Sequence, residues 1–267
     1  MNRHLTVVAV TDKGALRRHN EDAVLVSDWI AQTDHGSPTV FHLTPPQAMM
    51  CAVADGMGGH AAGQLASRVL LADLREHLAE FTDTDAIGAG ITGAGIRLGE
   101  LGRSPELTGL GTTIAGVLFK SDMIAAFNVG DSRVYQVVDG YLELVTLDDS
   151  VSGPDGHTTG ILTQSLGDGA PAKPHLFELG KDFTGRLLVC SDGVTGAVER
   201  DTLRATLAMH DPLVAVTELA AAVDRGGAED NYSIVLIVCS PPATAGAGHE
   251  PPNSTSPSHD PSTVSVT

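Results

Sequence analysis

Aromatic and basic residues are scarce in this 267-residue chain, and both shortages limit what the protein can bind. Phe, Trp and Tyr make up 4% of the residues, and 16 Lys and Arg stand against 33 Asp and Glu, a formal net charge of −17. Nucleic acids and anionic membrane surfaces are bound by basic surfaces, so we expect neither as a partner. The acidic balance is compatible with cation binding, although an ordinary acidic surface explains most of it.

Long apolar runs are also missing. No window approaches about eighteen uninterrupted apolar residues, so no membrane span is expected. The apolar run at residues 7–10 is far shorter than the core of a secretory signal peptide. Cys51, Cys190 and Cys239 each lie in or beside an apolar run, a pattern typical of buried free thiols in a reducing compartment. We therefore expect a cytoplasmic protein without disulfides.

Three familiar arrangements for phosphate or ester chemistry are absent from the sequence. A cysteine phosphatase needs the pattern C-x5-R, but the three positions that would hold the arginine are Met57, Gly196 and Ala245. No glycine-rich loop ends in Gly-Lys-Ser or Gly-Lys-Thr, which excludes a P-loop. No segment has the Gly-x-Ser-x-Gly pattern of a nucleophile elbow. A covalent mechanism therefore has no candidate nucleophile.

Hydrophobic periodicity predicts an α+β layered fold. Strands are predicted over residues 5–10, 23–27, 49–54, 112–119, 123–129, 133–138, 141–146, 186–191 and 232–238, and helices over 61–81, 83–102, 201–209 and 212–226. The dipeptide Asp139-Gly140 predicts a tight hairpin turn. In the first helix, Leu65, Val69, Ala72 and Leu78 are predicted to share the buried face. Strands in neighbouring pairs, with helix pairs between them, indicate antiparallel sheets covered by helices.

The end of the chain has a different composition. Residues 241–267 are rich in Pro, Ser, Thr and Gly and show no periodicity. Such a segment has too little apolar surface to form a core, so a disordered tail is predicted there. The predicted organisation is one domain over residues 1–240, followed by this tail.

Four carboxylates lie at the ends of predicted strands. They are Asp22, Asp55, Asp192 and Asp230. Glycine directly follows Asp55 and Asp192, which allows a sharp turn and a close approach of the backbone to a ligand. Each aspartate alone is most often a turn or cap residue, but four at strand ends are expected to share one cleft. Their mutual repulsion calls for a cation, and carboxylate and carbonyl oxygens suit Mg²⁺ or Mn²⁺.

Arg17 is the candidate anion-binding residue. It lies shortly before Asp22 in the segment TDKGALRRHNED. A guanidinium near a cluster of divalent cations suggests bidentate capture of a phosphate. The alternative, a surface arginine on an exposed turn, is not distinguished by spacing, and Arg18 stands directly beside it. Metal ions combined with an anion clamp indicate metal-assisted phosphate hydrolysis.

The chain resembles the metal-dependent protein phosphatases of the type 2C (PPM) family in their bacterial form. The matching segments, in the family's order, are TDKGALRRHNED (11–22), VADGMGGHAAGQLAS (53–67), GLGTTIAG (109–116), NVGDSRVYQ (128–136), LTQSLG (162–167), LLVCSDGVTGAV (187–198) and GGAEDNYSIVLIV (226–238). Together they span nearly all of residues 5–238. The resemblance implies a β-sandwich of two antiparallel sheets flanked by helix pairs, a four-layer αββα fold.

The resemblance also implies a site and an activity. Two Mn²⁺ or Mg²⁺ ions would be bridged by Asp55, with the Gly56 carbonyl and Asp22 on one side and Asp192 and Asp230 on the other. A metal-activated water would hydrolyse phosphoserine or phosphothreonine in a protein, with Arg17 holding the phosphate. The expected partners are phosphorylated proteins, including an opposing Ser/Thr kinase, and the enzyme is expected to be a monomer. The segment GDSR at 130–133 is interpreted as structural.

Two departures from the family's pattern concern side chains. Met57 stands two residues after Asp55, where animal members carry a histidine proposed as general acid. His60 is the nearby alternative for that role, although a lone loop histidine is more often solvated or capping. The usual Asp-His-Ser reads Asp148-Asp149-Ser150. Asp148 keeps the position that the resemblance gives to a third metal site, whereas the histidine of the pattern is replaced by Asp149.

A third departure concerns substrate access. Only residues 151–161 separate this segment from LTQSLG, where relatives carry a longer flap, so a more open cleft is expected. Two alternatives to a kinase-opposing phosphatase remain open. One is a non-catalytic module that binds phosphoproteins; it would have lost a metal ligand, and none of the four core aspartates is missing. The other is a phosphatase of anti-sigma-factor antagonists, which shares the chemistry and differs in its partner.

Overall fold

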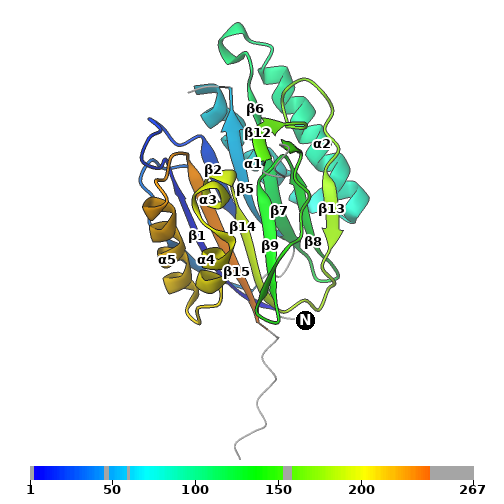
Figure 1. Cartoon of the computed structure of the whole chain (residues 1–267). Helices are drawn as coiled ribbons and strands as arrows, with labels where there is room; N and C mark the ends of the chain where they lie inside the picture. The colour runs from blue at the N-terminus through cyan, green and yellow to red at the C-terminus, as the bar shows by residue number, and fades with distance from the viewer. Residues whose placement is uncertain (1–2, 45–47, 59–60, 153–157, 241–267) are drawn as a thin grey trace, which may run out of the picture.

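Two antiparallel sheets, packed face to face, form the centre of the computed structural model, which describes residues 3–44, 48–58, 61–152 and 158–240 (Figure 1). The first sheet has the order β10 (Tyr141–Leu144), β9 (Arg133–Val138), β14 (Gly185–Cys190), β15 (Tyr232–Ser240), β1 (His4–Asp12) and β4 (Thr39–Leu43). The second has the order β13 (His175–Glu178), β8 (Ile124–Val129), β7 (Ile114–Phe119), β5 (Met49–Met57), β2 (Asp22–Val26) and β3 (Trp29–Ala31), with β6 (Gly111–Thr112) paired to β5. A separate hairpin joins β11 (Ser150–Ser152) and β12 (Thr158–Leu162).

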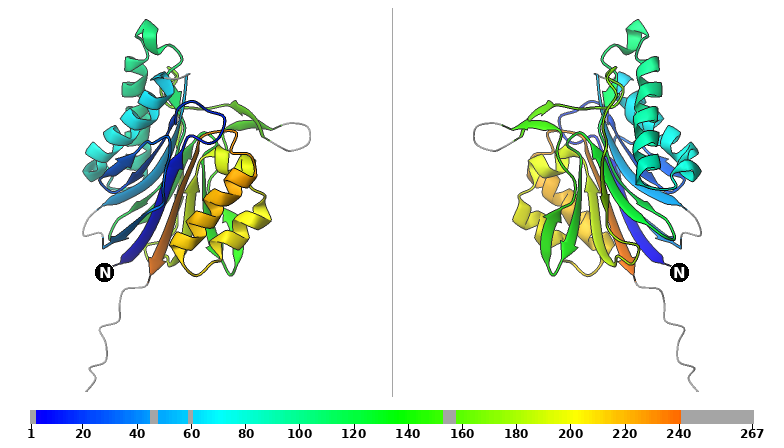
Figure 2. Two further views of the ribbon diagram at one scale, coloured as in Figure 1. Left: turned by 90° about the vertical axis from the view of Figure 1, so that its left-hand side faces the viewer. Right: turned by 90° about the vertical axis from the view of Figure 1, so that its right-hand side faces the viewer.

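Helices cover the outer face of each sheet, as Figure 2 shows. The second sheet is covered by α1 (Ala61–Glu76) and α2 (Thr84–Leu101), with short 3-10 turns at η1 (Leu78–Glu80) and η2 (Pro105–Leu107). The first sheet is covered by α3 (Asp192–Ala197), α4 (Arg200–Leu207) and α5 (Pro212–Arg225). The predicted four-layer α+β sandwich is therefore confirmed.

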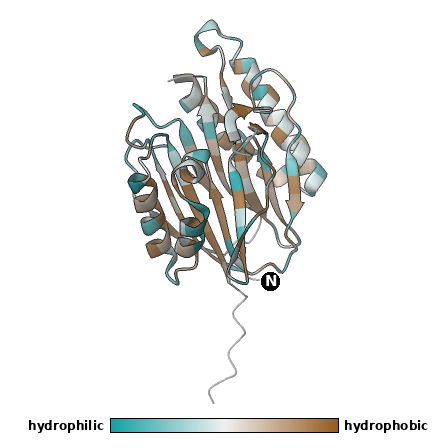
Figure 3. Ribbon diagram, in the orientation of Figure 1, coloured by the Kyte–Doolittle hydropathy of each residue, from teal (hydrophilic) through white to brown (hydrophobic). Residues whose placement is uncertain are grey.

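The central strands are apolar along most of their length, and both of their faces are covered by other elements (Figure 3). In β5, Met50, Ala52 and Ala54 pack beneath the helices, whereas the alternating Met49, Cys51 and Val53 pack between the two sheets. The period of two along a strand thus supplies two cores from one segment. All three cysteines are buried and free, as the sequence predicted.

The predicted elements lie where expected, and most differ from the observed ones at their ends by a few residues. At the predicted hairpin, Asp139 and Gly140 have φ of 51° and 78°, the left-handed pair that a two-residue turn between right-twisted strands requires. The sequence did not predict β3, β4, β11, β12, β13 or α3, which are short. Short elements carry too few periods of apolar residues to be recognised from sequence.

The apolar face predicted for the first helix was partly wrong: Val69 and Leu78 do pack against the core, but most of the buried residues of α1 lie elsewhere. Leu65 is 37% exposed, and the buried stripe of α1 is Ala62, Ala66, Leu70, Leu71 and Leu74. The prediction followed large apolar residues, but alanines at the start of the helix allow its backbone to lie close to β5 and β2. The inward face also contains Ser67, which is fully buried and donates a hydrogen bond to the Glu21 carbonyl at 2.6 Å.

The predicted tail, residues 241–267, lies outside the described residues. The last described strand, β15, is paired along its whole length and ends with Ser240 opposite His4. The boundary at residue 240 remains a prediction. Within the described part of the chain, none of the helices combines the length and the hydropathy needed to cross a bilayer.

Candidate active site

A cavity of about 880 Å³, called here the main cavity, opens at one end of the sandwich. Its lining includes a stretch of the loop between β1 and β2, the end of β5, and residues from the β11–β12 hairpin and the turn after it. Six carboxylates contribute to the lining: Glu21, Asp55, Asp131, Asp168, Asp192 and Asp230. The cavity wall is therefore strongly acidic.

The two sheets each deliver two of the four predicted aspartates to this end of the molecule. Asp22 and Asp55 are direct register partners on the neighbouring strands β2 and β5. Asp192 begins α3 after β14, and Asp230 lies just before β15, the strand next to β14 in the other sheet. The stacking of the sheets thus brings together residues that are far apart in the sequence.

Two of these carboxylates have buried oxygens without a partner among the described residues. Asp22 is fully buried, and its Oδ2 accepts a hydrogen bond from the Ser191 hydroxyl at 2.7 Å, while its Oδ1 has no donor. Burial raises the pKa of Asp22 to about 7. The Oδ1 of Asp192 is also buried without a donor, and burial and then the charge of Asp230 raise the pKa of Asp192. Orphaned carboxylate oxygens are costly unless a cation or a proton compensates them.

Asp55 lies at the centre of this repulsion. Burial raises the pKa of Asp55 well above its ordinary value, and the charges of Asp22, Asp192 and Asp230 raise it further. Hard divalent cations such as Mg²⁺ and Mn²⁺ prefer carboxylate oxygens of this kind, so the donor set fits them. As arranged, no three His, Cys, Asp or Glu side chains among the described residues already surround one metal position. One of the expected ligands, Asp230, is turned toward an arginine.

That arginine is Arg17. Its Nη2 donates to Oδ2 of Asp230 at 2.7 Å, and both side chains line the main cavity. Among the described residues, acceptors are found only for Nη2, so Nε and Nη1 are left to donate to a bound anion. The structure therefore brings Arg17 to the aspartates despite the distance in sequence between residues 17 and 230.

Asn231 holds the arginine-bearing loop in place, a role that the sequence analysis missed. The side chain of Asn231 is buried; its Nδ2 donates to the carbonyls of Lys13 and His19 at 2.8 and 3.0 Å, and its Oδ1 accepts from the Glu21 backbone at 2.8 Å. One amide thus fastens both ends of residues 13–21 to the segment just before β15, which carries Asp230. The sequence feature that could have indicated this role is the position of the asparagine directly after Asp230, a candidate metal ligand.

Glycines next to two of the aspartates are required by close backbone contacts. A Cβ on Gly56 would lie 2.0 Å from the Gly63 carbonyl oxygen, and one on Gly193 would lie 2.0 Å from the Asn231 carbonyl oxygen. Both distances are far below van der Waals contact, so a side chain at either position displaces the backbone beside Asp55 or Asp192. The predicted need for glycine after these aspartates has this steric cause.

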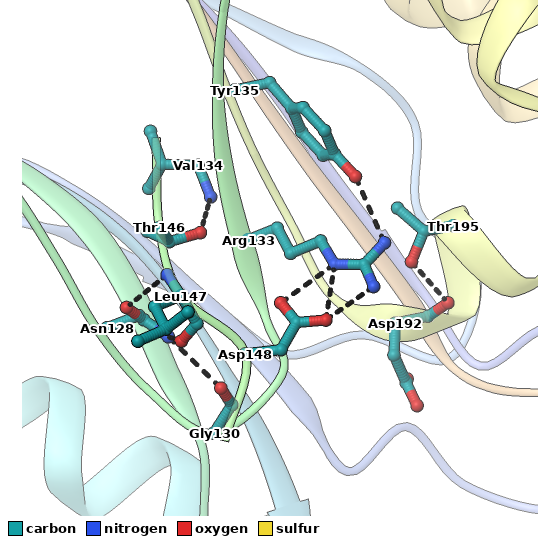
Figure 4. A network of polar contacts seen from close by, with 10 residues as sticks. All are labelled: Asn128, Gly130, Arg133, Val134, Tyr135, Thr146, Leu147, Asp148, Asp192 and Thr195. Atoms are coloured by element: carbon teal, nitrogen blue, oxygen red, sulfur yellow. Dashed lines mark hydrogen bonds and ion pairs between the residues drawn. The ribbon is translucent and has the colours of Figure 1, made fainter. Parts of the chain in front are cut away.

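The structure does not bring Asp148 into the acidic group. Its carboxylate accepts hydrogen bonds from Nε and Nη2 of Arg133 at 2.6 to 3.1 Å, and Figure 4 shows it turned toward that guanidinium. Asp131, from the GDSR segment interpreted as structural, lines the main cavity instead. Burial and then the charge of Asp192 raise the pKa of Asp131 to about 6. Asp148 thus pairs with an arginine and Asp131 faces the other carboxylates, and a third metal site at Asp148 remains a prediction.

Asp149, which stands where the family's pattern has histidine, supports the Asp131 loop. Its Oδ2 accepts from the backbone N–H of Gly130 at 3.0 Å, while its Oδ1 lies 2.9 Å from Nε2 of His175 and accepts from Gln164 at 2.8 Å. The side chain of Asp149 is buried. A histidine is therefore still present here, contributed by β13 rather than by the usual position.

Two further predictions concern the mouth of the cavity. His60 lies outside the described residues, and Met57 lines the main cavity. Gly160 of the shortened flap segment and the adjoining Leu162 also line the cavity, and Figure 2 shows the β11–β12 hairpin standing out from the sandwich. The shortened segment therefore still borders the site.

A family model for protein phosphatase 2C matches residues 39–225, which is more than half of the chain. The chain belongs to the protein phosphatase 2C family. Among curated members of the family, the chain is 31% identical over 205 residues to a protein phosphatase 2C-type protein of Streptococcus pyogenes, covering 69% of this chain and 83% of that one. It is 29% identical over 254 residues to the serine/threonine protein phosphatase PstP of Mycobacterium tuberculosis, covering 87% of this chain. The match spans only 44% of the length of PstP.

Solved structures of the family have the same fold. The crystal structure of M. tuberculosis PstP/Ppp superimposes with a TM-score of 0.73 at 27% identity, covering 88% of this chain and 98% of that one. The catalytic domain of PstP in complex with two manganese ions gives a TM-score of 0.70 at 26% identity, covering 88% and 99%. This chain thus has the fold of a phosphatase 2C catalytic domain.

Proposed function

We propose that this protein is a metal-dependent protein serine/threonine phosphatase. The observation that carries the proposal is the convergence of Asp22 and Asp55 from one sheet with Asp192 and Asp230 from the other. Buried oxygens of Asp22 and Asp192 lack donors within the described residues, and divalent cations fit such oxygens. The relatives named phosphatases and the PstP structure with two manganese ions support the same reading.

The residues have the following roles in this proposal. Asp22, Asp55, Asp192, Asp230 and the Gly56 carbonyl hold two Mn²⁺ or Mg²⁺ ions, and Asp131 rather than Asp148 is the acidic side chain available to a third. When bound, such ions lower the pKa of a coordinated water and offset phosphate charge. The Ser191 hydroxyl orients the Asp22 carboxylate. No covalent step is needed, in line with the absence of a candidate nucleophile.

Arg17 binds the phosphate of the substrate in this proposal. Its Nη2 stays on Asp230, and Nε and Nη1 donate to phosphate oxygens, so one guanidinium positions both a metal ligand and the substrate. Loop 13–21 is held by Asn231, which limits the entropy lost on binding. The substrates are phosphorylated proteins, including a Ser/Thr kinase, and the protein works as a monomer in the cytoplasm.

Hydrolysis of p-nitrophenyl phosphate tests the proposal. Activity should require Mn²⁺ or Mg²⁺, disappear on chelation and return when the ion is restored. A non-catalytic phosphoprotein-binding module would instead bind a phosphothreonine peptide without releasing phosphate under the same conditions. A protein that neither hydrolyses nor responds to Mn²⁺ in its melting temperature would contradict the metal site itself.

A further inference from the structure

The wall of the main cavity formed by residues 16–19 carries more positive charge than the proposed phosphate site uses. Arg17 is paired with Asp230, and Nδ1 of His19 lies 3.6 Å from the Asp34 carboxylate. Arg18 lines the same cavity, is exposed, and forms no ion pair with any described residue. One guanidinium therefore faces the cavity without a counter-ion, in a chain with 33 acidic and 16 basic residues.

The backbone that presents Arg18 is fastened to the rest of the fold. Besides the two Asn231 hydrogen bonds to the carbonyls of Lys13 and His19, the Ala15 N–H donates to the Ala228 carbonyl at 2.8 Å. Figure 2 shows this loop between β1 and β2 at the same end of the sandwich as the β11–β12 hairpin. A guanidinium on a backbone held in this way binds an anion with less loss of entropy than one on a free loop.

The rest of the cavity wall discriminates against additional negative charge. Six carboxylates line it. Bound divalent cations would contact the scissile phosphate and would not be available to a second anion. The cavity volume of about 880 Å³ exceeds that of a phosphate group, so residues that flank the phosphorylated one also enter it. A flanking acidic group is repelled by most of this wall and attracted beside Arg18.

We propose that Arg18 binds a second negative charge of the substrate, next to the phosphate that is hydrolysed. The preferred substrates are then phosphopeptides with a carboxylate or a second phosphate within a few residues of the scissile group. Both anions match the planar guanidinium fork, which pairs with either in a bidentate manner. This inference rests on the proposed phosphatase function and assigns a specificity role to a residue outside the metal and phosphate site.

Peptide substrates that differ at one position test this role. The full chain at saturating Mn²⁺ is assayed on phosphothreonine peptides that carry Glu, Lys or a second phosphothreonine at each position up to two residues away. We expect kcat/KM to be about three- to tenfold higher for the best Glu peptide than for its Lys counterpart, the scale of a partly exposed ion pair. Arg18→Ala should remove the difference, and Arg18→Glu should reverse it in favour of Lys.

Arg68→Ala is the matched control, because Arg68 is exposed on α1 and is absent from the cavity lining. It should keep the wild-type preference. A preference for the second phosphate alone identifies phosphate as the bound group, and a preference for Glu as well extends the site to carboxylates. Equal rates on all peptides, or an unchanged preference in both Arg18 variants, overturn the role of Arg18. If the wild type still hydrolyses p-nitrophenyl phosphate in that case, the proposed function stands.

Discussion

Asp22 and Asp55 are direct register partners on the antiparallel strands β2 and β5, and both carboxylates have raised pKa values because they are buried close together. Carboxylates that lie opposite each other on neighbouring strands repel each other and destabilise the pairing at that end of the strands. A divalent cation held by the pair, as proposed above, would offset this repulsion.

Replacing Asp55 should separate activity from stability. Asp55→Asn removes the charge shared by the proposed metal site, so hydrolysis of p-nitrophenyl phosphate in Mn²⁺ should fall by about a hundredfold or more. The metal-free variant should melt at a higher temperature than the metal-free wild type, because a buried repulsive charge is gone. Asp201→Asn, at a side chain that is 96% exposed, is the control. A folded Asp55→Asn protein with wild-type activity would refute the site.

The metal-free protein should become more stable on mild acidification. Burial raises the pKa of Asp22 from 3.8 to about 7 and that of Asp131 from 3.8 to about 6. The folded state therefore binds more protons than the unfolded state between about pH 4 and pH 7, and stability falls as the pH rises through this window. With a chelator present to remove metal ions, these groups should make the melting temperature of the protein higher near about pH 5 than near about pH 8.

Added Mn²⁺ should raise the melting temperature more at the higher pH, because protons compete with the cation for the same oxygens. Thermal scans of Asp22→Asn provide the comparison, since this variant loses one of the buried aspartates with a raised pKa. Its metal-free melting temperature should depend less on pH than that of the wild type. An identical pH dependence in the two proteins would show that other groups control it.

Loss of the Arg17 guanidinium should mainly raise KM, because its contact with phosphate exists in the bound substrate as well as in the transition state. A hydrogen bond to a charged group contributes about 1.5–3 kcal/mol, so Arg17→Ala should lower kcat/KM by about ten- to a hundredfold. Arg17→Lys should recover part of this loss. Arg68→Ala is a better control than Arg18→Ala, because Arg18 lines the same cavity. Equal kinetics for the Arg17 and Arg68 variants on one phosphothreonine peptide would exclude the phosphate role.

Two glycines of α3 provide a steric test of the same site. A Cβ on Gly193 would lie 2.0 Å from the Asn231 carbonyl, whereas one on Gly196 meets nothing within 4 Å. Gly193→Ala should therefore lower both the melting temperature and activity by shifting Asp192 relative to Asp230. Gly196→Ala should leave stability unchanged or raise it by up to about 1 kcal/mol, because alanine is the better helix former. Similar melting temperatures for the two variants would contradict this packing.

Truncation after Ser240 tests the domain boundary predicted from composition. β15 keeps its full pairing with β1 up to Ser240, so the shortened chain retains every strand of the first sheet. The melting temperature and the rate on p-nitrophenyl phosphate should stay close to those of the full chain, because residues 241–267 offer little to bury. A large drop in melting temperature would place the tail on the domain.

The sequence by itself determined the layers and the positions of the central aspartates. Apolar runs such as 49–54 and 232–238 predicted strands, and Asp139-Gly140 predicted a tight turn, and the structure has both. Asp22, Asp55, Asp192 and Asp230 were recognisable because a charge at the end of a buried strand is a local pattern. Local patterns can be recognised from the sequence because they depend only on residues that are neighbours along the chain.

Only the tertiary structure decided which neighbouring side chains join the site. Asp148 and Asp131 are both acidic residues near strand ends. Asp148 is bound by Arg133, whereas Asp131 is close to Asp192. The buried face of α1 and the role of Asn231 likewise depend on contacts between segments far apart in the chain. Such choices are set by strand register and by the stacking of one sheet on the other, which fix the direction of each side chain. The periodicity of residues along one strand does not show which side chain of another segment each residue will contact.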